Sequence, residues 1–378
     1  MIRSTLAFVL AAVVLGASQV PSTWLALGWH QEARRYLLYD IPAAEGFNLR
    51  RDVLTRALLL TEDLGSGWTL VLPPFHRMFH WRNDEPGDTM PWRAFLDLSR
   101  VSERVPLIEF ADYVRTHGAR VDRVLHLVTG PLDDKGARLE ARDCAALPPF
   151  GPRFFGGTTT IDAAARECRF LLAPYRALEP VLAALPGDSV LVDGLQIGYW
   201  DDTYGGARYW AMRERMQFAA PLVREADRFI ASAFGGTPYL AVHVRRGDFL
   251  ATPRPHPSLD DVVGQVAAAQ KRTGLTRLFL ATDGSDADVA YLRARLTFAR
   301  YTPPAGLAMT DGGIAILDQI VATRAAHFIG TEGSTFTRVI MEDREIAGRD
   351  PASTYDVLCK GEDTCPPSAR FPRPASMK

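Results

Sequence analysis

The sequence lacks the short motifs that identify several enzyme classes. It contains no Gly-x-x-x-x-Gly-Lys-Ser/Thr phosphate loop, no His-Glu-x-x-His metal motif and no Gly-x-Ser-x-Gly nucleophile turn. No Cys-x-x-Cys pair is present, so neither a structural zinc site nor a redox dithiol is indicated. Any chemistry must therefore come from residues that the fold brings together.

Lysine and asparagine are also scarce. Only four lysines occur, and the other basic residues are arginines, so a single arginine is weaker evidence of function here than elsewhere. Neither of the two asparagines, Asn48 and Asn83, begins a glycosylation sequon. The formal net charge of −1 gives no reason to expect nucleic acid or a membrane surface as a partner.

The chain begins with the features of a secretory signal. Arg3 supplies a positive charge, Leu6–Leu15 is an apolar run, and residues 16–18 are small enough for a cleavage site. The run is short for a transmembrane helix, although an uncleaved anchor also fits. We predict a signal peptide at 1–18 and no other contact with a membrane.

The four cysteines fit an oxidising compartment. Cys144 and Cys168 flank a loop rich in proline, glycine and aromatic residues, and Cys359 and Cys365 flank a short charged loop. Four cysteines allow three pairings. We favour the local one, Cys144 with Cys168 and Cys359 with Cys365.

Strand and helix patterns alternate along most of the chain. In the first half, strands are predicted at 35–40, 68–73, 105–110, 121–128 and 189–193, helices at 47–60 and 208–233, and an irregular insert at 130–169. In the second half, strands are predicted at 239–244, 277–281, 298–301 and 326–330, with helices beginning near 258, 286, 312 and 335. The βαβ repetition of the second half predicts a doubly wound parallel sheet.

Two such units predict an α/β protein of the GT-B type, with two Rossmann-like domains facing each other across a cleft. The expected N-terminal domain covers residues 35–236 and ends in a glycine-rich hinge. The expected C-terminal, nucleotide-binding domain covers 237–350. A tail at 351–378 would hold the second local disulfide.

Arginines stand at the end of one predicted strand. The apolar run Tyr239–Val244 leads directly into Arg245 and Arg246. Ligands of open α/β sheets bind beyond the carboxyl ends of the strands, and the arginine fork matches phosphate. The pattern favours a phosphate-bearing ligand; the plain alternative is that these charges meet solvent or pair with Asp248.

Other polar residues could complete such a site. Ser334 and Thr335 lie in a turn between a strand and a helix, where N–H groups and hydroxyls either meet an anion or cap the helix. Asp318 interrupts an apolar helical stretch, so it needs either an internal partner or N–H donors from a ligand such as a guanine edge. Glu45, at a glycine turn after the first strand, is the candidate acid–base residue; the alternative is an exposed loop carboxylate.

One Asp-x-Asp sequence was considered as a metal motif. Asp286 and Asp288 stand at the start of a predicted helix, where acidic residues interact favourably with the helix dipole. We therefore expect a helix start there and predict no metal site.

The segments that carry these residues resemble the GDP-fucose protein O-fucosyltransferase family, and within it the enzymes that act on thrombospondin type 1 repeats. The resemblance runs from Tyr36 to Cys365 and is most specific at 36–40 and 45–52. The other matching segments, in order, are 71–74, 79–81, 204–206, 209–210, 243–249, 281–283, 312–319, 334–336 and 345–355. Two stretches, 130–168 and 218–235, are shorter than in the animal enzymes, and both could border an acceptor groove.

The resemblance implies a role for each matching residue. Glu45 takes the place of the catalytic base, and Arg245 that of the essential arginine on the diphosphate. The remaining donor-binding matches are Gly46, Phe47 and Asn48 in the nucleotide-sugar loop, His243 and Asp318 at the guanosine, and Ser334, Thr335 and Phe336 at its phosphates and base. The four cysteines match family disulfide positions, which supports the local pairing.

The resemblance also implies the reaction. It is a metal-independent, inverting transfer of fucose from GDP-fucose to Ser or Thr of folded, disulfide-bonded thrombospondin type 1 repeats, without a cofactor. The alternatives are transfer to EGF-like repeats or to a glycan, or an inactive repeat-binding chaperone, although Glu45 and Arg245 are both intact. The expected location is the endoplasmic reticulum lumen or the Golgi, and the expected state a monomer.

Overall fold

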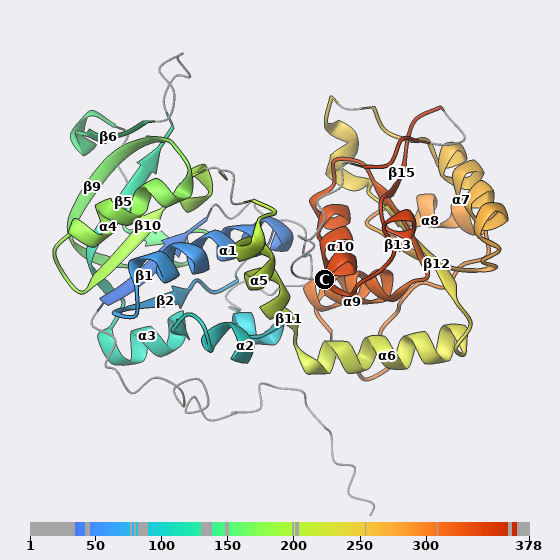
Figure 1. Ribbon diagram of the computed structural model, residues 1–378, viewed down its shortest axis with the longest axis horizontal. Helices are drawn as coiled ribbons and strands as arrows, with labels where there is room; N and C mark the ends of the chain where they lie inside the picture. The colour runs from blue at the N-terminus through green and yellow to red at the C-terminus, as the bar shows by residue number, and fades with distance from the viewer. Residues whose placement is uncertain are drawn as a thin grey trace, which may run out of the picture.

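The structure is a computed structural model that describes residues 35–41, 46–75, 78, 81, 90–129, 138–147, 151–198, 200, 204–253, 255–307, 309–361 and 365–368. Two largely parallel sheets, each packed with helices, form the two halves seen in Figure 1. The α/β class predicted from the sequence is confirmed. The predicted signal peptide at 1–18 and Glu45 lie outside the described residues.

The first sheet has seven strands in the order β4-β2-β1-β10-β5-β9-β6, and only β6 runs antiparallel to its neighbour. In chain order they are β1 (Arg35–Asp40), β2 (Trp68–Leu72), β4 (Leu107–Glu109), β5 (Arg120–Val128), β6 (Arg138–Arg142), β9 (Asp162–Leu172) and β10 (Ser189–Asp193). The central strands are buried along most of their length, as expected where helices cover both faces.

The second sheet has four parallel strands in the order β13-β12-β14-β15. They are β12 (Tyr239–Val244), β13 (Arg277–Thr282), β14 (His327–Thr331) and β15 (Asp356–Leu358). Its helices are α7 (Leu259–Thr273), α8 (Asp286–Arg293), α9 (Asp311–Arg324) and α10 (Thr335–Ile346). In the register of β12 on β13, Val244 pairs with Thr282, so the residues that follow these two strands meet at one edge.

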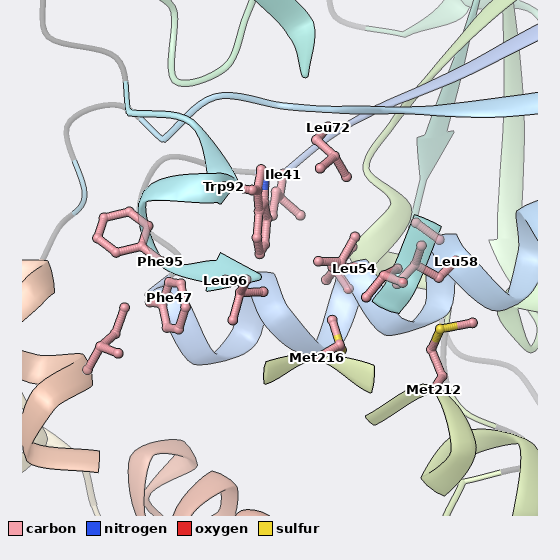
Figure 2. Close-up of a cluster of buried hydrophobic side chains, with 14 of the residues drawn as sticks. Ile41, Phe47, Leu54, Leu58, Leu72, Trp92, Phe95, Leu96, Met212 and Met216 are labelled. Carbon is pink, nitrogen blue, oxygen red and sulfur yellow. The ribbon is translucent and has the colours of Figure 1, made fainter. Parts of the chain in front are cut away.

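Helix α1 (Phe47–Leu64) lies between the first sheet and the second half of the molecule. Its apolar side chains pack into a large core that also holds Trp92 and Leu96, and Figure 2 shows Phe47 and Leu54 within this cluster. The ring of Phe47 lies 5.6 Å from that of Phe95, among several other aromatic rings. This aromatic packing anchors the start of the helix.

The predicted helix at 208–233 is wrong as a single element. It is two helices, α5 (Ala207–Arg215) and α6 (Ala220–Phe234), separated by the short strand β11 (Gln217–Phe218). Pro221 lies in the first turn of α6, a position that proline accepts, whereas it would break a continuous helix. The separated α6 packs beneath the second sheet, where Glu225 accepts a hydrogen bond from Tyr301 at 3.0 Å.

The insert predicted to be irregular at 130–169 contains β6 and most of β9, two strands of the first sheet. β9 is a parallel neighbour of β5 and carries β6 at the edge of the first sheet. The strand expected at 298–301 is reduced to an isolated bridge between Ala299 and Phe279. The connecting helices α2 (Ser99–Ser102), α3 (Phe110–His117) and α4 (Glu179–Ala184), with the short strands β3 (Leu96–Asp97), β7 (Arg153–Phe154) and β8 (Thr159–Thr160), complete the first half.

The cysteines form the local pairs that the sequence favoured. Cys144 is bonded to Cys168 in β9, and Cys359, just after β15, is bonded to Cys365.

None of the helices in the described part of the chain has the length and apolar character needed to cross a bilayer.

Candidate active site

A cavity of about 440 Å³ lies between the start of α1 and the second sheet. Its walls come from the first turn of α1, from α9, from the start of α10 and from the carboxyl ends of β12 and β13. It brings together every described residue that the sequence assigned to the donor site: Gly46, Phe47, Asn48, His243, Arg245, Asp318, Ser334, Thr335 and Phe336. Of the predicted site residues, only Glu45 lies outside the described ranges, one residue before this wall.

Arg245 lies at the carboxyl end of β12 in the second sheet. Its backbone N–H donates to the Thr331 hydroxyl at 2.9 Å, which ties the end of β12 to β14. Its guanidinium forms ion pairs with Asp248 and Asp283, and both carboxylates also line the cavity. The arginine is therefore fixed beside the cavity before any ligand arrives.

The side chain of Arg246 contacts α8 and the loop before α7 and does not line the cavity. Its guanidinium lies 3.4 Å from Asp288 and donates to the backbone oxygen of Pro257. Asp288 in turn forms a capping box with Ser285 at the start of α8, so the Asp-x-Asp sequence is a helix start, as predicted. Of the two adjacent arginines, only Arg245 lines the cavity.

His243 is a buried, neutral imidazole. Its Nδ1 lies 2.8 Å from the Thr337 hydroxyl, and its ring lies 4.5 Å from that of Phe336. Burial, with a smaller effect of Arg245, lowers the pKa of His243 to about 3. The ring is thus an uncharged wall of the cavity, with Nε2 as the nitrogen not engaged by Thr337.

Asp318 is a buried carboxyl group on α9 whose Oδ1 has no hydrogen-bond partner among the residues that the structure describes. Burial raises its pKa to about 8, against the opposing effect of Arg300. An unpaired buried carboxyl oxygen is destabilising unless a ligand supplies donors. The structure thus places in the cavity wall a hydrogen-bond acceptor to which no described part of the chain donates.

Two helix N-termini face the same cavity. Gly46 and Ser334, the N-cap residues of α1 and α10, make no side-chain capping bond. By contrast, the N-caps of α7, α8 and α9 all accept a backbone N–H through a side-chain hydroxyl. The first N–H groups of α1 and α10 can therefore meet an anion, and both helix dipoles favour one there.

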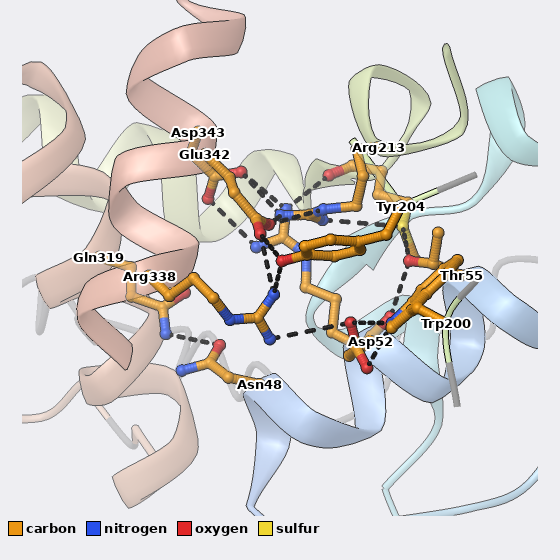
Figure 3. A network of polar contacts seen from close by, with 12 residues as sticks. Asn48, Asp52, Thr55, Trp200, Tyr204, Arg213, Gln319, Arg338, Glu342 and Asp343 are labelled. Atoms are coloured by element: carbon orange, nitrogen blue, oxygen red, sulfur yellow. Dashed lines mark hydrogen bonds and ion pairs between the residues drawn. The ribbon is translucent and has the colours of Figure 1, made fainter. Parts of the chain in front are cut away.

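Below the cavity, a polar network joins α1 and α5 to α10 (Figure 3). Arg51 of α1 holds Asp343 of α10 through two hydrogen bonds of 3.0 and 3.1 Å. Arg213 of α5 lies 2.9 Å from Glu342 of α10, with both side chains almost fully buried. Geometry of this kind fixes the relative position of the two helices whose N-termini line the cavity.

Several lining residues were not assigned from the sequence. Asp283 follows β13 just as Arg245 follows β12. Because ligands of open α/β sheets bind at the carboxyl ends of the strands, its place in the sequence indicates that Asp283 lines the cavity. Trp81 packs against Gly312 so closely that an added Cβ would lie 2.5 Å from its ring, a proximity without a local sequence signal. Across the described ranges, no three His, Cys, Asp or Glu side chains are grouped so as to hold a metal ion.

A cavity between two parallel α/β halves, with an arginine, a buried carboxyl group and two open helix N-termini, is the arrangement of a GT-B glycosyltransferase. The family model described as GDP-fucose protein O-fucosyltransferase matches residues 36–347. The chain belongs to this family, and it is a glycosyltransferase.

Individual relatives agree with this assignment. The chain is 32% identical to the human GDP-fucose protein O-fucosyltransferase 2, over 87% of each chain. It is 31% identical to the Caenorhabditis elegans protein of the same name, over 89% of this chain and 90% of the relative. Among solved structures, POFUT1 in complex with GDP-fucose superposes with a TM-score of 0.60 at 16% identity, over 86% of this chain and 99% of that one. This superposition confirms the predicted fold.

Proposed function

We propose that this enzyme transfers fucose from GDP-fucose to Ser or Thr hydroxyls of folded thrombospondin type 1 repeats, with inversion and without a metal ion. The observation that carries the proposal is the single cavity that joins Asp318, Arg245 and the N-termini of α1 and α10. The names of the relatives support GDP-fucose as the donor and a protein as the acceptor. The choice of repeat rests on the sequence resemblance at 36–40 and 45–52.

The donor would bind through complementary chemistry at its base and at its diphosphate. A guanine edge presents N–H donors, which suit the unpaired carboxyl oxygen of Asp318. A diphosphate presents only acceptors, which suit the Arg245 guanidinium and the N–H groups at the starts of α1 and α10. Uncharged His243 and the ring of Phe336 would line the guanosine between the base and the diphosphate.

In the proposed reaction, the carboxylate of Glu45 removes the proton of the acceptor hydroxyl as its oxygen attacks the anomeric carbon of fucose. The bond between that carbon and the phosphate oxygen breaks, and its electron pair leaves with GDP. Attack opposite the leaving group inverts the anomeric configuration. The charge that develops on the diphosphate is stabilised by Arg245 and the helix N–H groups, which act where other transferases use a cation.

We also propose that the enzyme works in the secretory pathway, in the lumen of the endoplasmic reticulum or the Golgi. The signal-like sequence at 1–18 and the two disulfides support this location. Both disulfides lie outside the cavity walls, so their role would be to stabilise the fold.

An acceptor panel tests the proposal. The purified protein is incubated with radiolabelled GDP-fucose and a folded thrombospondin repeat, the same repeat after reduction, an EGF-like repeat or a glycan, each with and without EDTA. We expect transfer only to the folded thrombospondin repeat, insensitive to EDTA, with the inverted anomer in the product. Labelling of the EGF-like repeat or the glycan would reassign the acceptor, and loss of activity in EDTA that manganese restores would refute the metal-free mechanism.

A further inference from the structure

An amide pair joins the two halves of the molecule at the cavity. Gln319 of α9 donates from Nε2 to Oδ1 of Asn48 in the first turn of α1, at 2.9 Å (Figure 3). The two residues are 271 positions apart in the sequence, and both line the cavity. Their exposed fractions are only 7% for Asn48 and 1% for Gln319, so solvent competes little with this bond.

The bond determines which end of the Asn48 amide is available to a ligand. Its oxygen is directed at Gln319, and Figure 3 shows its nitrogen on the opposite side. No hydrogen bond from this nitrogen to another described residue is present. The N–H₂ group of Asn48 is therefore free, as far as the described chain is concerned, to donate to the oxygens of a ligand in the cavity.

The position of Gln319 leaves one of its polar atoms unsatisfied within the described chain. Its own Oε1 is buried and accepts no hydrogen bond from the described residues, and an unpaired buried amide oxygen is destabilising. An apolar side chain of similar size in α9 would not carry that penalty. A structural role in α9 therefore does not account for a glutamine here, whereas a role toward Asn48 does.

We propose that Gln319 is a positioning residue, which holds the Asn48 carboxamide so that its N–H₂ group donates to the sugar diphosphate of the donor. The inference rests on the proposed function for the identity of this ligand. Because Gln319 directly follows Asp318 on α9, the same turn of helix would contact the guanine and orient Asn48. Placement of the base and of the transferred end of the donor would thus be set together.

A double-mutant cycle tests the proposal. The variants Asn48→Ala, Gln319→Met and their combination are compared with wild type for kcat and for KM of GDP-fucose. We expect Gln319→Met to raise KM about 3–10-fold, as for one misplaced hydrogen bond, and to leave kcat within about twofold. The double variant should equal Asn48→Ala alone, because Gln319 acts only through Asn48.

The matched control is Gln265→Met. Gln265 is also a nearly buried glutamine of the second half, but it bonds to the backbone of Cys359 and does not line the cavity. This variant should lower the melting temperature without changing KM. If Asn48→Ala fails to fold, Asn48→Asp replaces it: it keeps an oxygen for Gln319, lacks the N–H₂ group, and suits the start of a helix. We expect it to weaken GDP-fucose binding at least about tenfold at unchanged melting temperature.

Additive effects in the cycle, an unchanged KM in Gln319→Met, or wild-type affinity in Asn48→Asp would each overturn the inference. Direct calorimetric binding of GDP-fucose to wild type separates this failure from that of the proposed function. A wild type that binds GDP-fucose, while Gln319→Met binds it equally well, overturns the positioning role alone. A wild type that does not bind GDP-fucose overturns both.

Discussion

If Asp318 accepts the N–H donors of guanine, as proposed, its buried carboxyl group should make donor binding depend on pH. In the free protein its pKa is raised to about 8, so at pH 7 about nine molecules in ten carry the proton there. Guanine offers N–H donors, which the ionised carboxylate accepts and the protonated group accepts less well. Binding of GDP-fucose must therefore expel this proton, and affinity should rise as the pH rises toward 8.

The size of the effect follows from this pKa. The fraction of free protein with an ionised Asp318 increases about 50-fold between pH 6 and pH 8. The Kd of GDP-fucose should therefore fall by about the same factor, which makes the binding free energy more favourable by about 2 kcal/mol. At pH 7 the complex should release about 0.9 proton per GDP-fucose bound. Above pH 8 the dependence should level off.

Calorimetry in buffers of different ionisation enthalpy measures both the affinity and the released proton. The titrations should use GDP-fucose and not GDP. The terminal phosphate of GDP titrates near pH 6, so its own proton would be counted with the one released by the protein. His243, with its pKa lowered to about 3, stays neutral throughout. Asp40 and Glu109, whose pKa values burial raises to about 6 and about 7, titrate in this range but do not line the cavity.

The matched variant is Asp318→Asn, which cannot titrate. It should bind GDP-fucose more weakly than wild type at pH 8, and its residual affinity should be flat with pH. A wild-type Kd that changes less than about threefold between pH 6 and 8, or binding without proton release, would refute the assignment of Asp318 to the guanine edge.

Three further changes probe the rest of the site and its support. Arg245→Met should lower kcat by about 10²–10³, the effect of one lost preorganised donor, whereas Arg246→Met should change initial rates less than about threefold because Arg246 faces away from the cavity. Glu45→Gln should bind GDP-fucose with wild-type affinity in calorimetry but transfer about 10²–10⁴ more slowly; weak binding with normal turnover would contradict its role as base. Arg213→Met removes the main partner of buried Glu342, which keeps Arg338 at 2.9 Å, and should cost up to about 3–5 kcal/mol in denaturant-induced unfolding, while a cost below about 1 kcal/mol would mean that the pair is not buried in solution.

Much of the cavity lining could be predicted from the sequence because its signals are local. An apolar strand that ends in charged residues, as at Val244 and Arg245, indicates a sheet edge that can bind a ligand. A carboxylate in an apolar helix, as at Asp318, indicates either a partner or a ligand. The fold then brings these local features into one cavity, because parallel strands place their carboxyl ends at the same edge.

Other features were mispredicted where two patterns competed. The apolar periodicity continues across 216–219 and suggested one helix, but Pro221 requires a new start, and the chain uses the break to cross beneath the second sheet. β9 escaped detection because it carries charged residues such as Arg166 and Glu167, which pair or reach solvent beside the edge strand β6 instead of forming a uniformly apolar run. In both cases tertiary context overrode the local pattern.

Contacts between the halves left no local trace at all. Arg51 and Asp343 are 292 residues apart, and the amide pair of Asn48 and Gln319 is nearly as distant. In a chain whose basic residues are almost all arginines, nothing in the sequence distinguishes buried Arg51 from an exposed surface arginine. Only a three-dimensional structure can assign such residues.

These distant contacts bear on how the enzyme would accommodate its donor. The bidentate pair of Arg51 and Asp343 and the buried pair of Arg213 and Glu342 fix α10 against the first half of the molecule. The directional hydrogen bonds of these pairs hold α1 and α5 in one position relative to α10. The N-termini of α1 and α10 are held at a fixed separation, so the diphosphate would meet a preorganised site, in which electrostatic stabilisation requires little rearrangement during the reaction.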